Sequence, residues 1–181
     1  MMIFCSILVC ASMIDLKHFL IPDSLTLGGT LLGLALSTIF PSVHQTANPF
    51  LGFICSLKGL VIASSLLLWI GLVAEWILRK EAIGFGDVKL LGCFGAFLGW
   101  ESGLWAIFGG ACLGSLFFVM YGIVQKIHTL LYPAQPLQKL HLKSRVPFAP
   151  FLSLSTLLYL FFFQDSFKEY LHNFWTIVTN F

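Results

Sequence analysis

The sequence predicts an all-α, polytopic membrane protein with about six transmembrane helices and an amphipathic helix at the C-terminus. Three observations support this fold class. Of the 181 residues, 58% are hydrophobic and only 10% are charged, whereas a soluble domain is about 45–50% apolar and about 25% charged. Apolar segments recur from one end of the chain to the other. The positive charges fall mainly in alternate connections between those segments.

Six apolar segments account for the expected spans. A helix that crosses a hydrocarbon core of about 30 Å needs roughly 20 residues, at a rise of about 1.5 Å per residue. The predicted spans are residues 1–14, 24–40, 59–78, 90–100, 103–124 and 147–163. The first and the fourth are short for a bilayer, so their crossing needs a separate argument.

The distribution of lysine and arginine supplies that argument. If all six segments cross, residues 15–23, 79–89 and 125–146 lie on one side and contain eight of the ten basic residues. The positive-inside rule places that side in the cytoplasm. A re-entrant fourth segment would move residues 125–146 to the outside, against the rule. We therefore predict that the short segments cross as well.

The C-terminal tail, residues 164–181, has a different pattern from the spans. Its apolar residues follow a spacing of 4, 3, 4 and 3, which is typical of an amphipathic helix lying on a membrane surface. They are Phe167, Leu171, Phe174, Val178 and Phe181. We treat residues 1–181 as a single transmembrane domain in contact with lipid.

Several classes of function are disfavoured by composition. The five cysteines stand singly inside apolar segments, and the five histidines are scattered, so we predict neither a metal site nor a cofactor. The basic residues form no stripe with interleaved aromatics, so we do not expect nucleic acid as a partner. Small residues at four-residue spacing are expected to pack helices closely rather than to form sites. These pairs are Gly29 with Gly33, Gly95 with Gly99, and Gly110 with Gly114.

Two of the eight acidic residues adjoin the two short spans. Asp15 directly follows the first segment, and Asp87 directly precedes the fourth segment. A short helix draws its end residue toward the membrane interior, so these carboxylates can meet at a shallow, partly desolvated depth. Such a pair shares one proton near neutral pH. One member can then deprotonate a water while the other protonates a peptide carbonyl.

A structural interpretation competes with the catalytic one at these positions. Asp23 and Asp87 could both be helix N-caps, and for Asp23, which follows Pro22, we expect this role. At Asp87, capping does not explain the neighbouring Gly84 and Gly86, which would let a substrate backbone approach the carboxylate. Asp15 ends a helix, where the dipole disfavours an anion, so its position also suggests function.

Three segments resemble those of type IV prepilin peptidases. They are "IDLKHFLIPDSLTLGG" (residues 14–29), "KEAIGFGDVKLLGCFGAFLGW" (residues 80–100) and "VPFAPFLSL" (residues 146–154). The second resembles the family's G-x-G-D segment, and the third resembles its "PFGPFLAL" run, with Ala149 where glycine is usual. All three occur in the expected order along nearly the whole chain.

The resemblance implies a membrane aspartyl endopeptidase of the bacterial inner membrane. Its substrates would be type IV prepilins or the pseudopilins of type II secretion, cleaved at their N-terminal leader on the cytoplasmic side. The family's catalytic aspartates correspond to Asp15 and Asp87, and Asp23 corresponds to a common accompanying position. We expect Gly84 and Gly86 to contact the substrate backbone, and Glu81 to attract the basic leader.

The sequence departs from the usual family pattern at its start. Bacterial members usually carry a further helix and a cytoplasmic domain with paired C-x-x-C motifs, which is associated with N-methylation. This sequence has only 14 residues before Asp15, so we expect peptidase activity without methyltransferase activity. The loop between the second and third segments is expected to be longer than usual. Two alternatives stay open: a non-catalytic scaffold or fragment, and a transporter in which the acids relay protons or bind a cation.

Overall fold

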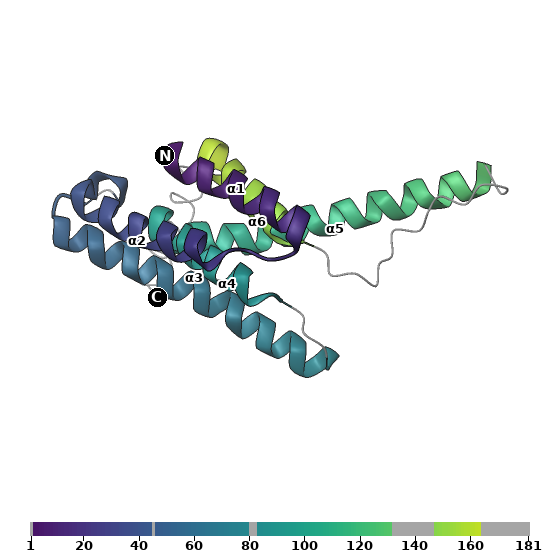
Figure 1. Ribbon diagram of the computed structural model, residues 1–181, viewed down its shortest axis with the longest axis horizontal. Helices are drawn as coiled ribbons and strands as arrows, with labels where there is room; N and C mark the ends of the chain where they lie inside the picture. Colours follow the sequence, from purple (N-terminus) through teal and green to yellow (C-terminus); the bar gives the residue numbers. More distant parts are fainter. Residues whose placement is uncertain (1, 45, 80–82, 132–146, 164–181) are drawn as a thin grey trace, which may run out of the picture.

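The computed structural model describes residues 2–44, 46–79, 83–131 and 147–163, and within them the chain is all-helical (Figure 1). Six α-helices fall at the six predicted segments. They are α1 Met2–His18, α2 Asp23–Ile39, α3 Pro49–Leu78, α4 Phe85–Leu98, α5 Trp100–Leu131 and α6 Ala149–Leu158. A short 3-10 helix, η1 Pro41–His44, follows α2, and a π-helical turn, η2 Tyr159–Phe163, extends α6. The predicted C-terminal amphipathic helix and Glu81 lie outside the described residues.

Two helices have the length and composition of membrane spans. These are α3 and α5, and little of the most apolar stretch of either helix is buried in the protein. Large side chains face outward along them, including Trp76 of α3, which is 83% exposed, and Phe108 of α5, which is 67% exposed. An apolar surface of this extent matches lipid rather than water. The six predicted helices are therefore confirmed, and the properties of a span are established for two of them.

The short helix α4 forms the centre of the bundle. Every residue from Leu90 to Leu98 is buried, and α4 packs against α2, α3, α5 and α6. The ring of Phe4 in α1 contacts Phe94 edge to face, at 5.7 Å between centroids. Because protein surrounds α4, its length need not match that of a lipid-exposed span.

The C-terminal end of α4 is hydrogen-bonded by serines from neighbouring helices. The last carbonyl groups of a helix have no partner within it, and they are costly to leave unpaired away from water. Ser56 of α3 donates to the carbonyl oxygen of Ala96 at 2.5 Å. Ser102 of α5 donates to the carbonyl of Gly99 at 2.7 Å. These hydroxyls let α4 end inside the bundle.

Glycines allow the closest approach between helices. At the crossing of α3 and α4, a Cβ on Gly59 would collide with the backbone of Gly95, and a Cβ on Gly95 would collide with the backbone of Gly59. The predicted packing role of Gly95 is therefore confirmed. Gly99 differs from the prediction: it is the C-cap of α4 with φ +90°, a conformation that favours glycine.

The start of α3 also differs from the sequence prediction. The helix begins at Pro49, ten residues before the predicted Gly59. Residues 50–58 thus extend the helix, and the connection that we expected to be long reduces to residues 40–48, part of which is η1.

Candidate active site

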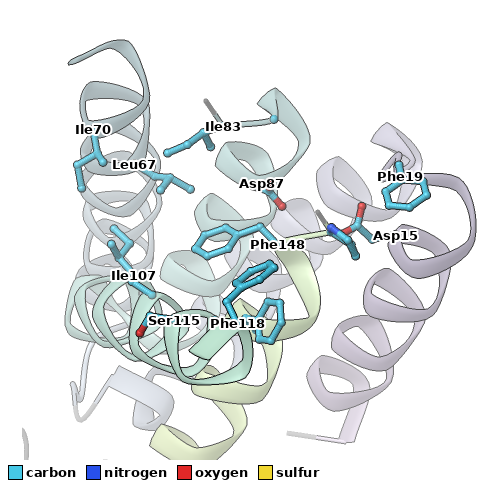
Figure 2. Close-up of a pocket in the computed structure, with 15 residues that line it drawn as sticks. Asp15, Phe19, Leu67, Ile70, Ile83, Asp87, Ile107, Ser115, Phe118 and Phe148 are labelled. Atoms are coloured by element: carbon cyan, nitrogen blue, oxygen red, sulfur yellow. The ribbon is translucent and has the colours of Figure 1, made fainter. Parts of the chain in front are cut away.

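A cavity of about 590 Å³ lies among α1, α3, α4, α5 and α6, and it contains both Asp15 and Asp87 (Figure 2). The rest of its wall is mostly aliphatic and aromatic. Besides the two aspartates, the lining residues are Phe19, Leu67, Ile70, Ile83, Gly84, Ile107, Ala111, Gly114, Ser115, Phe118, Pro147, Phe148 and Phe151. The two carboxyl groups, 72 positions apart in sequence, are thus brought into one apolar-walled space.

Asp15 projects from the last turn of α1 toward the start of α6. Its side chain is only 6% exposed, and Oδ2 accepts a hydrogen bond of 3.3 Å from the backbone N–H of Ala149. Asp15 lies after the predicted first span, which ends at residue 14. Burial raises the pKa of its carboxyl, and the Ala149 hydrogen bond opposes that rise.

Asp87 is the third residue of α4, whose N-cap is Gly84. Its backbone N–H donates to the Gly84 carbonyl at 3.0 Å, and the residue is 9% exposed. It precedes the predicted fourth span, which starts at residue 90. Burial raises the pKa of the Asp87 carboxyl, and the charge of Asp15 raises it further. The two carboxyls are therefore electrostatically coupled, as a shared-proton pair requires.

The two glycines beside Asp87 lie in different surroundings. Gly84 lines the cavity, and a Cβ there would lie 3.4 Å from Oδ2 of Asp87. Gly86 is absent from the cavity wall, and its nearest neighbour is Ile21, which a Cβ would approach to 3.3 Å. The structure thus places Gly84 beside the carboxylate, and Gly86 against the connection between α1 and α2.

Asp23 does not form the predicted cap. The N-cap of α2 is Pro22, and Asp23 is the first helical residue, with no side-chain cap hydrogen bond. Its Oδ1 instead accepts a hydrogen bond of 2.6 Å from Nζ of Lys89. The expectation was wrong because a cation from α4 competes for the carboxylate, and this partner is 66 positions away in sequence.

The contribution of α6 to the site was not predicted. Its first residue donates to Asp15, and Phe148 and Phe151 form part of the cavity wall. A signal was available in the run "VPFAPF", because proline is favoured in the first turn of a helix and marks a helix start there. Within the described part of the chain, no group of three or more His, Cys, Asp or Glu residues is arranged to hold a metal ion.

Fold and site together define a helical protein with two helices long and apolar enough to span a membrane, and with two carboxyls in one apolar-walled cavity. The chain belongs to the Type IV leader peptidase family, whose profile matches residues 2–119.

Three curated relatives illustrate the similarity, and all are named prepilin leader peptidase/N-methyltransferase. The protein of Legionella pneumophila is 31% identical over 176 residues, which is 93% of this chain and 51% of the relative. The protein of Aeromonas hydrophila has the same identity and coverage. That of Pectobacterium carotovorum subsp. carotovorum is 35% identical over 102 residues, 56% of this chain and 33% of the relative. The chain thus spans about half the length, or less, of these relatives. No solved structure matches it.

Proposed function

We propose that this protein is a membrane aspartyl endopeptidase that removes the N-terminal leader of type IV prepilins or type II secretion pseudopilins. Asp15 and Asp87 activate a water and the scissile carbonyl, and no cofactor takes part. The proposed location is the bacterial inner membrane, with the active site on the cytoplasmic side, where the positive-inside rule puts both aspartates. The peptidase reaction is the activity that we assign to residues 1–181, which we treat as one domain.

One observation carries the proposal: two buried carboxyls share a cavity, and the charge of one raises the pKa of the other. A structural role would not require two acids to be held together away from water, because unpaired buried charge destabilises a fold. General acid and base chemistry on a peptide requires such a pair. Family membership supplies the substrate class.

The cavity wall suggests how the substrate binds. The leader junction is proposed to lie extended past Gly84, whose missing side chain lets a peptide backbone approach Asp87. The apolar segment that follows the junction in a membrane-anchored substrate would lie against the walls from α3 and α5, which include Leu67 and Ile107. Glu81 is proposed to attract the basic leader, and Gly86 supports the loop at Ile21.

Cleavage of a leader-bearing prepilin in lipid vesicles by the purified protein tests the proposal. Asp15→Asn and Asp87→Asn should each lower the cleavage rate by about 10²–10⁴-fold, the usual contribution of a general acid or base. Asp23→Asn is the matched control, since this carboxylate pairs with Lys89 and does not line the cavity. It should retain activity within about threefold, a difference of less than 1 kcal/mol.

Two outcomes would contradict the proposal. A folded wild type that cleaves none of several prepilins and pseudopilins would favour a scaffold. Proton or cation flux through vesicles, lost in the same two variants without any cleavage by the wild type, would favour a transporter.

A further inference from the structure

The two carboxyls differ in what holds them. Oδ2 of Asp15 accepts a hydrogen bond from the N–H of Ala149, the first residue of α6. An N–H at that position has no carbonyl partner within its own helix, and it lies at the positive end of the helix dipole. Ala149 is fully buried, so water does not compete for its N–H.

Among the residues that the structure describes, Asp87 has no comparable donor. No described residue donates a hydrogen bond to its carboxylate, and the charged group that acts on it is Asp15. Asp87 does lie in the first turn of α4, whose dipole also favours an anion. A direct hydrogen bond to the ionised form stabilises charge more than an unpaired helix end does, because its N–H is aimed at one carboxylate oxygen.

We propose that Asp15 is the ionised member of the pair and Asp87 the protonated member, and that the Ala149 amide is the positioning group that sets this division. The proposal rests on the peptidase function proposed above, for which it assigns the base and the acid. Burial raises the pKa of both carboxyls, and the Ala149 amide opposes that rise at Asp15 alone, so the amide favours the charge on Asp15.

Other charged groups in the described ranges do not account for the asymmetry. Its own helix α1 packs against α6 and α2, and α6 with η2 contains no charged residue. The charged groups on these elements and on α4, besides Asp15 and Asp87, are Lys17 and His18, both exposed in the last turn of α1, and Asp23 paired with Lys89. The remaining titratable groups there are Tyr159 of η2 and the thiols of Cys5, Cys10 and Cys93.

The assignment gives a balanced reaction. Asp15 takes one proton from water as the hydroxide oxygen bonds to the scissile carbon, and Asp87 gives its proton to the carbonyl oxygen. The product is a neutral gem-diol, with Asp15 now protonated and Asp87 ionised. Asp15 then protonates the leaving nitrogen as the C–N bond breaks, and Asp87 takes a proton from one hydroxyl. The products are a carboxylic acid and an amine, and the pair returns to its starting state.

Infrared spectroscopy of the whole chain in lipid nanodiscs at neutral pH tests the division without any need for cleavage. The C=O stretch of a protonated carboxylic acid should be present in the wild type, persist in Asp15→Asn and disappear in Asp87→Asn. The reverse pattern, or the same behaviour in both variants, would overturn the assignment. Failure of the cleavage assay would reject the peptidase function instead, so the two failures are distinguishable.

The role of the amide has its own test. Replacing Ala149 by lactic acid during translation in vitro changes one backbone N–H into an ester oxygen and keeps the side chain. The acid limb of the pH dependence of kcat/KM should move upward by about one to two pH units, since a charge-assisted hydrogen bond is lost from the base. A leucic acid ester at Leu152, whose N–H donates to the Phe148 carbonyl, is the control and should leave the limb in place.

An unmoved limb in the Ala149 ester, or an equal movement in both esters, would overturn the positioning role. If the Ala149 ester does not fold, the infrared pattern of the two aspartate variants decides the assignment.

Discussion

At the scale of single residues, Asp87 is a carboxyl group whose ionisation is opposed by two features of its surroundings. It is buried, and the nearest charge acting on it has the same sign. Its raised pKa means that the folded state binds a proton more tightly than the unfolded chain does. The stability contributed by this proton is fully present below the ordinary aspartate range and is lost as the pH rises through the raised value.

Asp87→Asn should therefore stabilise the protein at neutral and alkaline pH while abolishing cleavage. The expected gain is on the order of 2–4 kcal/mol at pH 8, and it should vanish below about pH 3, where the wild-type carboxyl is protonated in both states. Thermal unfolding in detergent between these pH values measures it. Asp23→Asn, which removes an ion-paired carboxylate, should show no such gain. Equal stability of wild type and Asp87→Asn at every pH would contradict the proposed burial of an ionisable group.

The two cavity aspartates could be found from the sequence because each adjoins a span that is too short. The hydrogen bond from α6 to Asp15 and the ion pair of Asp23 with Lys89 could not be found in this way. The amide of Ala149 lies 134 positions from Asp15, and the partner of Asp23 is on α4. Local rules such as helix capping describe only groups a few residues apart, so a tertiary ion pair overrides them without leaving a mark in the nearby sequence.

At the scale of elements, the crossing of α3 and α4 is the closest backbone contact that the glycines reveal. Gly59 and Gly95 face each other there, and backbone atoms fill the space that a methyl group would need. Gly95→Ala must push the two helices apart and should destabilise the protein by about 2–3 kcal/mol. Unfolding in detergent measures the loss.

Gly28→Ala provides the matched control for this crossing. Gly28 lies inside α2, and a Cβ there would meet nothing within 4 Å. Alanine should thus be neutral or stabilising by about 0.5–1 kcal/mol. If both alanine variants behaved alike, helix propensity rather than the crossing would explain the effect of Gly95→Ala.

The six helices were predictable from the sequence, but the residues at which they begin and end were not. Apolar segments identified all six helices, because lipid and core both require apolar side chains. The same uniform hydrophobicity hides where a helix starts, so α3 begins ten residues earlier than predicted, at Pro49. The spacing of small residues likewise does not tell a packing glycine such as Gly95 from a C-cap glycine such as Gly99.

At the scale of the whole molecule, the arrangement of helices explains how an acid pair can operate beside lipid. The central helix α4 brings Asp87 to the cavity, and α1 and α6 together hold Asp15. Walls from α3 and α5 complete the space with apolar side chains, while the outer faces of these two helices carry exposed apolar side chains. A substrate with an apolar segment next to its cleavage site can therefore contact both the walls and the acids.

Filling the cavity should block such a substrate without unfolding the protein. Ser115 of α5 lines the cavity, whereas its neighbour Leu116 does not and is 59% exposed. Ser115→Trp places an indole in the space that we assign to the substrate, and it should lower kcat/KM for prepilin cleavage at least about tenfold, or about 1.4 kcal/mol in the barrier.

Leu116→Trp adds the same ring to the outer face and should change kcat/KM by less than about twofold, since an apolar ring there meets lipid. Both variants should unfold within a few degrees of the wild type. Equal loss in the two variants would place the substrate on the outer face of α5, and no loss in either would place it away from this helix altogether.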